Sequence, residues 1–220
     1  MNNIVIYTAI TNNYDTLPVV KCVDPYLDYV CFTDNPRLKS DIWKIVLLPV
    51  LGKEAREDKK VKILPHRYFE NYDISIWVDA NYILYKNLHN FVDIALKYYD
   101  HAVFKHHANR TNLEEEVNIC IKYRKEDSQK LKDQLEKYRQ EFKDITFEIV
   151  HNAIIVRRHN KEKVKTVMEE WWKEIQKWTM RDQISFPYIA YKYNYQYDVL
   201  NISSLKNNWF ERTKHERRKR

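Results

Sequence analysis

Residues 74–81 read ISIWVDAN, and this stretch decides the fold of the chain. Its first five residues form an apolar run typical of a buried strand, and the run ends abruptly in a carboxylate, Asp79. Asn81 follows two residues later, and residues two apart on an extended segment point to the same side. In an open α/β sheet, ligands bind at the carboxyl ends of the strands. The stretch therefore predicts an α/β enzyme in which Asp79 and Asn81 bind a hard divalent cation beside a phosphate-bearing substrate.

Strand patterns and helical patterns alternate on both sides of this stretch. The strand patterns cover residues 3–9, 27–33, 42–48, 102–105, 147–156 and 195–202. The helical patterns cover residues 53–71 (with a new turn starting at Pro65), 88–99, 160–178 and 182–193. Such alternation predicts a central parallel or mixed sheet with helices on both faces.

Residues 113–143 differ from the rest of the chain, because charged side chains dominate them and only a thin apolar thread runs through. The pattern predicts two helices, separated near Asp127, that form a charged insertion standing partly off the core. No repeat, low-complexity tract or linker interrupts the sequence. We therefore expect one domain over residues 1–220, with a basic tail at residues 211–220.

The single glycine of the chain, Gly52, excludes several classes of nucleotide site and active site. A dinucleotide-binding G-x-G-x-x-G, a P-loop and a G-x-S-x-G nucleophile elbow each need at least two glycines. A phosphate group must therefore be bound by a metal ion, by Lys and Arg side chains, or by helix N-termini.

The formal net charge of +7 is concentrated at the C-terminus. The last ten residues hold six basic side chains against two glutamates, which leaves +3 for the other 210 residues. The basic residues are Arg212, Lys214, Arg217, Arg218, Lys219 and Arg220. A nearly balanced body does not indicate a nucleic-acid partner. The tail is interpreted as a solvated end or, alternatively, as a weak anchor to an anionic membrane surface.

The three cysteines are odd in number and lack metal-type spacing, which favours a reducing compartment. Cys31 lies inside a strand pattern and is expected to pack as a small hydrophobe. The N-terminus lacks the charged leader and long apolar run of a signal peptide, and no window approaches 18 apolar residues. We expect a cytoplasmic protein, peripheral at the membrane if the tail binds lipid.

Polar side chains follow the first two predicted strands. Thr8, Ala9, Thr11, Asn12 and Tyr14 come at and after the end of the first, where a nucleotide can lie; ordinary turn chemistry is the alternative. Asp34 ends the second strand, where a carboxylate can accept from a ribose hydroxyl or a base N–H. It can equally start the turn at Asn35-Pro36.

Three further groups of polar residues come just before a strand, after a strand or at a helix start. Lys62 and Arg67 precede the 74–78 strand and can contact phosphate, although a solvated charged face is the default interpretation. His106 and Arg110 follow the 102–105 strand and can bind a polar ligand, whereas Thr111 and Glu114 beside them fit a capping box. The third group, at the last helix, is Arg181, Asp182 and Gln183. Asp182 can grip or deprotonate a sugar hydroxyl, or complete a capping box with Thr179.

The order of these motifs resembles the GT-A superfamily of nucleotide-sugar-dependent glycosyltransferases. The motifs are YTAITNNYD, DYVCFTDN, a Lys-rich helix, SIWVDAN, HNAIIVRRHN, RDQISFPY and NNWFERTKH. The likeness is strongest to short enzymes that build capsule or surface polysaccharides and to related plant glycosyltransferase-like domains. It implies a Rossmann-like single domain, a nucleotide-sugar donor (UDP-sugar favoured), hexosyl transfer and a glycan acceptor in surface-polysaccharide or glycoprotein-glycan synthesis.

The resemblance also implies residue roles. Asp79 and Asn81 match the Asp-any-Asp motif that clamps the donor diphosphate through manganese or magnesium, and His215 matches a late third metal ligand. Asp182 is the expected catalytic carboxylate. The expected donor nucleotide-binding residues are Thr8, Ala9, Thr11, Asn12, Tyr14, Asp34, Lys62 and Arg67. The expected sugar-binding or acceptor-binding residues are His106, Arg110, Asn152, Arg181 and Gln183.

The chain departs from the family motif at Asn81, where an aspartate is usual. The amide removes one negative charge from the metal site, which lowers the expected metal affinity and leaves metal-independent action open. Three other functions are weighed: a sugar-nucleotide nucleotidyltransferase, a non-catalytic nucleotide- or carbohydrate-binding module, and a nucleic-acid binder using the tail. The first of these usually has a glycine-rich N-terminal loop, which is absent between Thr8 and Asp15.

Overall fold

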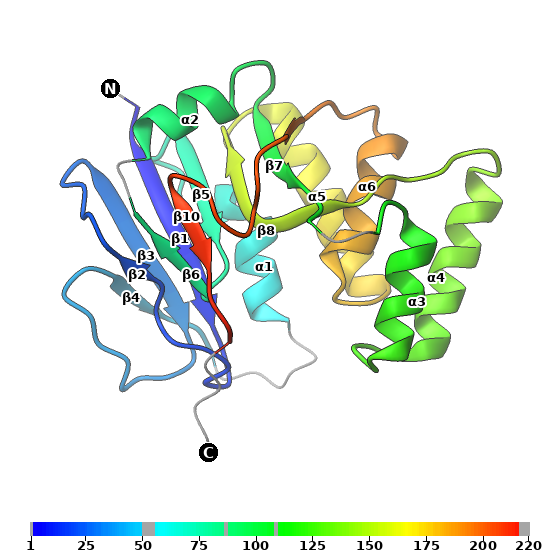
Figure 1. Ribbon diagram of the computed structural model, residues 1–220, viewed down its shortest axis with the longest axis horizontal. Helices are drawn as coiled ribbons and strands as arrows, with labels where there is room; N and C mark the ends of the chain where they lie inside the picture. Colours follow the sequence, from blue (N-terminus) through cyan, green and yellow to red (C-terminus); the bar gives the residue numbers. More distant parts are fainter. Residues whose placement is uncertain (1, 50–55, 86–87, 108–109, 216–220) are drawn as a thin grey trace.

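The computed structural model describes residues 2–49, 56–85, 88–107 and 110–215, and its centre is a seven-stranded sheet (Figure 1). The strand order is β4-β3-β1-β5-β8-β7-β9. The strands are β1 (Ile4–Ile10), β3 (Leu27–Thr33), β4 (Lys44–Leu47), β5 (Ile74–Val78), β7 (His101–Lys105), β8 (Val150–Arg157) and β9 (Asp198–Leu200). Four of the six pairings are parallel and only β8 runs antiparallel to its neighbours, which confirms the predicted mixed, mostly parallel sheet.

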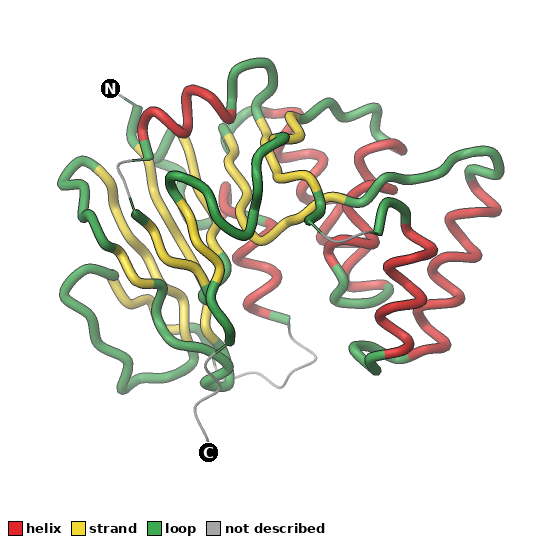
Figure 2. The backbone as a smooth tube through the Cα atoms, viewed as in Figure 1, coloured by secondary structure: helices red, strands yellow, loops and turns green. Residues whose placement is uncertain are grey.

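Helices occupy most of the segments in which they were expected (Figure 2). They are α1 (Glu57–Ile63), the 3-10 turn η2 (Pro65–Arg67), α2 (His89–Ala95), α3 (Leu113–Lys122), α4 (Ser128–Glu141), α5 (Glu162–Lys177) and α6 (Asp182–Lys192). Pro65 starts η2, as predicted. Asp127 caps α4 by accepting a hydrogen bond from the amide of Lys130 at 2.7 Å, so the charged segment does divide there.

A second, three-stranded sheet was not predicted. It consists of β10 (Phe210–Arg212), β6 (Tyr82–Leu84) and β2 (Val19–Val20), in that order. β10 pairs antiparallel with β6, which begins one residue after Asn81. In Figure 1 this small sheet lies in front of the main sheet, with β10 in red. The pairing brings the C-terminal segment of the chain beside the end of β5.

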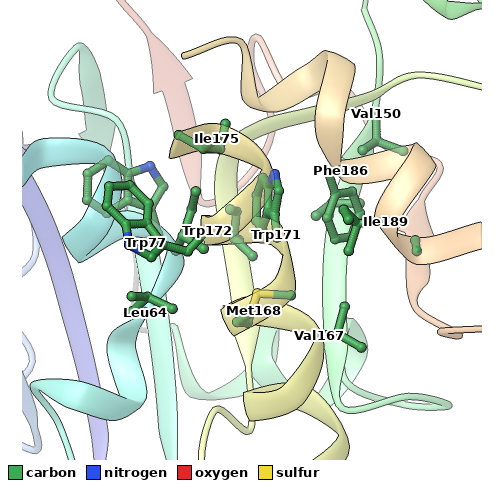
Figure 3. Packing of buried hydrophobic residues seen from close by; sticks show 14 of the residues in the cluster. Leu64, Trp77, Val150, Val167, Met168, Trp171, Trp172, Ile175, Phe186 and Ile189 are labelled. Carbon is green, nitrogen blue, oxygen red and sulfur yellow. The ribbon is translucent and has the colours of Figure 1, made fainter. Parts of the chain in front are cut away.

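The core lies on both faces of the main sheet because successive strand residues point to opposite sides. Val5 and Tyr7 of β1 pack into one cluster with α1, α5 and α6, whereas Ile4 and Ile6 pack into another with α2 and the small sheet. Figure 3 shows Trp171 and Met168 of α5 inside the first cluster. The predicted amphipathic face of α5 is therefore confirmed.

The charged helices α3 and α4 stand at one side of the molecule, beside α6 (Figure 1). Their apolar residues Leu113, Val117 and Leu131 pack into the same cluster as α5. Most of their charged residues face outward, but Glu116 is buried. Cys31 is buried in the core on the opposite face of the sheet, as expected. Within the described part of the chain, no helix is both long and apolar enough to cross a membrane.

Candidate functional site

One edge of the main sheet gathers most of the predicted site residues. β1, β3, β5 and β7 end there, and β8 begins there because it runs antiparallel to β5 and β7. The amide of Asp79 donates to the carbonyl of Ala153 at 2.8 Å, so the residue is held at the end of the β5–β8 ladder. This edge is where ligands bind in open α/β sheets.

A buried lysine joins two carboxylates at the centre of this edge. The Lys62 ammonium lies 2.6 Å from Asp182 Oδ2 and 3.4 Å from Asp79 Oδ1. Lys62 and Asp182 are 3% and 4% exposed, whereas the Asp79 side chain is 36% exposed. Lys59 lies 3.4 Å from Asp182 Oδ2, and the Trp77 indole donates to Asp79 Oδ1 at 2.7 Å. The two lysines and the two aspartates carry equal and opposite charge. Because the Asp79 side chain is partly exposed, solvent can reach this group.

The backbone of Lys62 is held in place by Arg157, which was not among the predicted site residues. The fully buried guanidinium of Arg157 donates to the carbonyl of Lys62 at 2.6 Å and to that of Ile63 at 3.2 Å. The Tyr7 hydroxyl donates to the Lys62 carbonyl at 2.9 Å and accepts from Arg157 at 2.6 Å. These two carbonyls belong to the last turn of α1, which has no helical donors left for them. Arg157 therefore fixes the end of α1 and, with it, the position of Lys62.

Both members of the Lys62–Asp182 pair are charged. Burial alone raises the pKa of Asp182, but Lys59, Lys62 and Arg181 outweigh it and hold that pKa well below its usual range. Burial lowers the pKa of Lys62, and Asp182 and Asp79 more than offset this, so the net shift is upward. At neutral pH the pair is an ammonium and a carboxylate that each stabilise the other.

We expect Asp182 to make the stability of the protein sensitive to acid. A carboxyl whose pKa is lowered by folding contributes stability above its ordinary pKa and loses it as the pH falls through the folded-state pKa. We compare the free energy of unfolding of wild type with that of Asp182→Asn. The difference between the two should be constant down to about pH 4. Below that pH it should decrease by up to about 1.4 kcal/mol per pH unit. Urea titrations of both proteins at neutral pH and below pH 4 measure it; a constant difference throughout would contradict the lowered pKa.

The C-terminal segment runs back over this edge and brings His215 to Asn81. Thr213 donates its amide to the Asn81 carbonyl at 2.8 Å, and the Asn81 amide donates to the Thr213 carbonyl at 3.1 Å. His215 Nε2 then lies 3.5 Å from Asn81 Nδ2. His215 Nδ1 lies 2.6 Å from the buried Asp15 carboxylate, and its ring packs on Tyr14 with centroids 5.2 Å apart. The tail thus folds back as the predicted role of His215 requires.

Two of the three predicted metal ligands, Asn81 and His215, lie next to each other. Among the described residues, no three His, Cys, Asp or Glu side chains are grouped to bind a metal, and the predicted set has two such residues and an amide. The Asp15 carboxylate at Nδ1 leaves His215 Nε2 directed to Asn81, which is how metal-binding histidines are usually oriented. Lys62 and Trp77 both reach Asp79 at Oδ1. A carboxylate, an imidazole and an amide suit Mn²⁺ or Mg²⁺, with affinity limited by the single carboxylate.

Five of the predicted nucleotide-binding residues lie at the end of β1 and in the loop after it. Thr8 and Ala9 lie in β1, and Thr8 is fully buried. The amide of Tyr14 donates to the Thr11 carbonyl at 3.1 Å, which closes a turn in which Asn12 and Asn13 have positive φ values of 55° and 50°. Asparagine tolerates this left-handed region better than most residues.

Asp34 holds this turn in place. Its carboxylate accepts from the amide of Asn12, at 2.9 Å for Oδ2 and 3.1 Å for Oδ1. Asp34 therefore links the end of β3 to the loop after β1. Tyr14, which is 48% exposed, forms the outer wall of the loop beside His215.

The predicted sugar-binding residues lie on the other side of Asp182, at β8, β7 and the start of α6. The Asn152 amide donates to the Asp182 carbonyl at 3.4 Å, and Arg181 donates to Gln183 Oε1 at 2.8 Å. Arg181 and Arg110 share the fully buried carboxylate of Glu116, at 3.3 and 2.7 Å.

Neither predicted capping box forms. Thr179 donates to Gln134 Oε1 at 2.8 Å and does not cap α6, so the structural alternative for Asp182 is wrong. At α3 the cap is Asn112, which accepts from the amide of Glu115 at 3.0 Å. The predicted capping box had its cap one residue earlier, at Thr111, paired with Glu114. In the structure the Glu115 carboxylate instead accepts a hydrogen bond from the Thr111 amide.

Arg67 is the predicted residue that the structure places apart. Its guanidinium binds Glu169 of α5, and His66 binds the same carboxylate at 2.8 Å.

The predicted membrane contact of the tail rests mainly on residues 216–220, which lie outside the described residues.

Several residues that shape the site were not predicted. They are Asp15, Lys59, Glu116, His151, Arg157 and Arg212. Two had a sequence signal: His151 lies inside the predicted 147–156 strand and Arg157 directly follows it, where an unpartnered polar group would be costly.

Comparisons with known proteins identify the family of the chain and show a shared fold. A family model described as TOD1/MUCI70, glycosyltransferase-like domain, matches residues 26–217. No curated protein sequence matches the chain. Apo mouse xyloside xylosyltransferase 1 superimposes with a TM-score of 0.50 at 8% identity, over 90% of this chain and 84% of that one. The apo glycosyltransferase GlyE of Streptococcus pneumoniae TIGR4 gives 0.44 at 8% identity, over 91% and 45% of the two chains.

Proposed function

Because the chain belongs to the family of TOD1/MUCI70 glycosyltransferase-like domains, we propose that it transfers a hexosyl group from a nucleotide-diphosphate sugar to a hydroxyl of a glycan acceptor. A UDP-sugar is the favoured donor. The mixed α/β fold with its seven-stranded sheet agrees with the glycosyltransferase likeness of the solved structures. The observation that supports the proposal best is the Lys62–Asp182 pair at the ligand-binding edge, beside Asp79.

In this proposal, the two substrates lie next to each other along the edge, in the order of its strands. The loop after β1, held by Asp34 just after β3, receives the nucleotide. Asp79 after β5, Lys62 and Lys59 lie next along the edge and receive the diphosphate. Asp182, Asn152 and Gln183 follow at β8 and α6 and bind the acceptor hydroxyl and the transferred sugar. A hydroxyl held in this way loses much of the orientational cost of the reaction.

Binding of the donor activates Asp182 in this proposal. Phosphate oxygens compete for the ammonium groups of Lys59 and Lys62, which lie 3.4 and 2.6 Å from Asp182 in this structure. A carboxylate that loses its counterions regains an ordinary pKa and becomes a better proton acceptor. Asp182 then takes the proton of the acceptor hydroxyl as the new glycosidic bond forms, while the lysines stabilise the charge that builds on the leaving diphosphate.

A divalent cation is a further part of the proposal. Asp79, Asn81 and His215 would hold Mn²⁺ or Mg²⁺, which would add positive charge at the leaving diphosphate. Asp15 would keep the His215 ring oriented toward it.

The donor is tested by thermal shift and by donor hydrolysis over UDP-, GDP- and CDP-sugars, with and without manganese. We expect UDP-sugars to raise the melting temperature and to be hydrolysed slowly in the absence of acceptor. If no nucleotide sugar stabilises the protein and none is hydrolysed, the proposed function is wrong. Stabilisation without turnover under any condition would instead indicate a non-catalytic binding module.

Asn81→Asp should increase manganese affinity about tenfold, because it adds a carboxylate to a site that has one. Isothermal titration of Mn²⁺ into the donor-free protein measures the effect without reference to activity. Asp79→Asn is the opposite change and should reduce binding. If Asn81→Asp and wild type bind Mn²⁺ equally and His215→Ala changes neither, these residues do not form the metal site.

A further inference from the structure

Three histidines and three arginines are linked by contacts and are not used by the transfer step; one of them, Arg181, directly precedes Asp182. We call them the His/Arg cluster: His106, His107, His151, Arg110, Arg181 and Arg212. The His107 ring lies 5.1 Å from the His106 ring and 4.6 Å from the His151 ring, measured between centroids. The cluster draws on the end of β7, the start of β8, the start of α6 and strand β10, which are far apart in the sequence.

Two histidines of the cluster, His107 and His151, are neutral at neutral pH. Arg110 and Arg212 each place a guanidinium nitrogen 3.4 Å from the Nε2 atom of His106 and His107, respectively. Because a guanidinium only donates, these two ring nitrogens accept. Burial, reinforced by the neighbouring histidines and Arg212, lowers the pKa of His107 to about 4 and that of His151 to about 2. The positive charge of the cluster therefore comes from its arginines.

The arginines outnumber the carboxylates around them. Among the described residues, the ion pairs of Arg110 and Arg181 reach the same carboxylate, Glu116, and Arg212 contacts the neutral His107. Three guanidinium groups facing one carboxylate leave two positive charges in excess. Arg110 and Arg181 keep about a quarter of their side-chain surface exposed, and Arg212 is exposed, so a ligand can reach them.

The place of the cluster separates it from the donor. Along the main sheet, the nucleotide loop is at β3 and β1, Asp79 is at β5, and the three histidines of the cluster are at β7 and β8 beyond it. Arg212 reaches His107 from β10 of the small sheet. Asn152, next to His151, is 1% exposed and its side-chain oxygen has no hydrogen-bond partner in the described structure. A buried polar atom without a partner indicates a group that arrives with the ligand, such as a sugar hydroxyl.

We infer that the His/Arg cluster is a subsite for an acidic group, a carboxylate or a phosphate, on the acceptor glycan. This inference rests on the proposed function, because it places the acceptor at the Asp182 side of the edge. A guanidinium presents paired N–H donors that match the two oxygens of a carboxylate or a phosphate. The flat faces of the neutral histidine rings offer apolar surface to the sugar ring, and Asn152 accepts one of its hydroxyls.

The experiment compares three sugars of similar size on the full chain: methyl glucuronide, glucose 6-phosphate and methyl glucoside. Binding is measured by saturation-transfer NMR titration without nucleotide. We expect the acidic sugars to bind at least about tenfold more tightly than the neutral one, which corresponds to one charge-assisted contact. The two acidic sugars distinguish a carboxylate from a phosphate as the preferred group.

Arg212→Gln should remove most of this preference, about tenfold, while leaving the fold intact because the side chain is exposed. Lys206→Gln is the matched control, since it removes one positive charge from an exposed pair with Glu211 in the same C-terminal segment. Equal binding of acidic and neutral sugars, or equal effects of the two substitutions, would overturn the inference. UDP binding is followed in parallel. Binding of acidic sugars without any nucleotide binding would refute the proposed function alone. Nucleotide binding without a preference for acidic sugars would refute the subsite alone.

Discussion

Asp182→Asn should lower kcat for glycosyl transfer by about 10²–10⁴-fold, with little change in KM for the donor. The substitution keeps the shape of the side chain but removes its ability to take a proton at neutral pH. Within the described ranges, Asp182 is the one carboxylate at this edge that is both buried and held against two lysines, at 2.6 and 3.4 Å. Initial rates with saturating UDP-sugar and acceptor measure the effect, with donor binding followed by thermal shift.

Asp73→Asn is the control for this experiment. Asp73 precedes β5 at the opposite end of the sheet, is exposed, and accepts a hydrogen bond from the amide of Asn3 at 2.8 Å. It makes the same chemical change away from the site and should leave kcat within about twofold of wild type, as expected for a surface substitution. Retention of full activity by Asp182→Asn would show that another group, or solvent, accepts the proton.

The pH profile separates a base from a merely structural carboxylate. If Asp182 is the base, wild-type kcat falls on the acid side as the carboxylate of the donor complex becomes protonated. The residual activity of Asp182→Asn should lack this acid limb. An acid limb of the same midpoint in both proteins would assign it to a different group.

The main sheet was predictable because its strands are marked locally. The predicted limits of β3 and β5 coincide with those observed, since each is an apolar run bounded by polar residues. The small sheet was not predictable for the opposite reason. Strands β2, β6 and β10 have two or three residues each, too few for a period, and β10 forms only because Phe210 and Arg212 meet β6 far back in the chain.

The candidate site likewise contains residues that could be selected from the sequence and residues that could not. Asp79 and Asn81 could be selected from one strand, because their position at its end is a local feature. The Lys62–Asp182 pair could not, since 120 residues separate its members and a lysine-rich helix is usually a solvated face. The two helices present one lysine and one aspartate to each other only after α1 and α6 have packed on the same face of the sheet. The sequence shows the groups, and the fold shows that they are paired.

Arg157→Met should destabilise the protein by about 3 kcal/mol and lower Tm by roughly 6–12 °C. Methionine fills a similar volume, so little of the loss comes from a cavity. The loss comes from the carbonyls of Lys62 and Ile63 and from the Tyr7 hydroxyl, which all contact the guanidinium. Removing a desolvated charge offsets part of this, because burial already lowers the pKa of Arg157. The hydrogen bonds lost by these three partners outweigh that gain, although the Tyr7 hydroxyl still donates to the Lys62 carbonyl.

Arg158→Met provides the matched control from the next residue of the chain. Arg158 is partly exposed and pairs with Asp100 at 3.1 Å, so its loss should cost less than about 1 kcal/mol. Urea unfolding of the three proteins measures the free energies, and the donor KM of Arg157→Met reports whether Lys62 has moved with the end of α1. Equal costs for the two substitutions would mean that solvent or neighbouring groups replace the buried guanidinium. A large stability loss with an unchanged donor KM would mean that Lys62 is positioned by its carboxylates and not by the arginine below it.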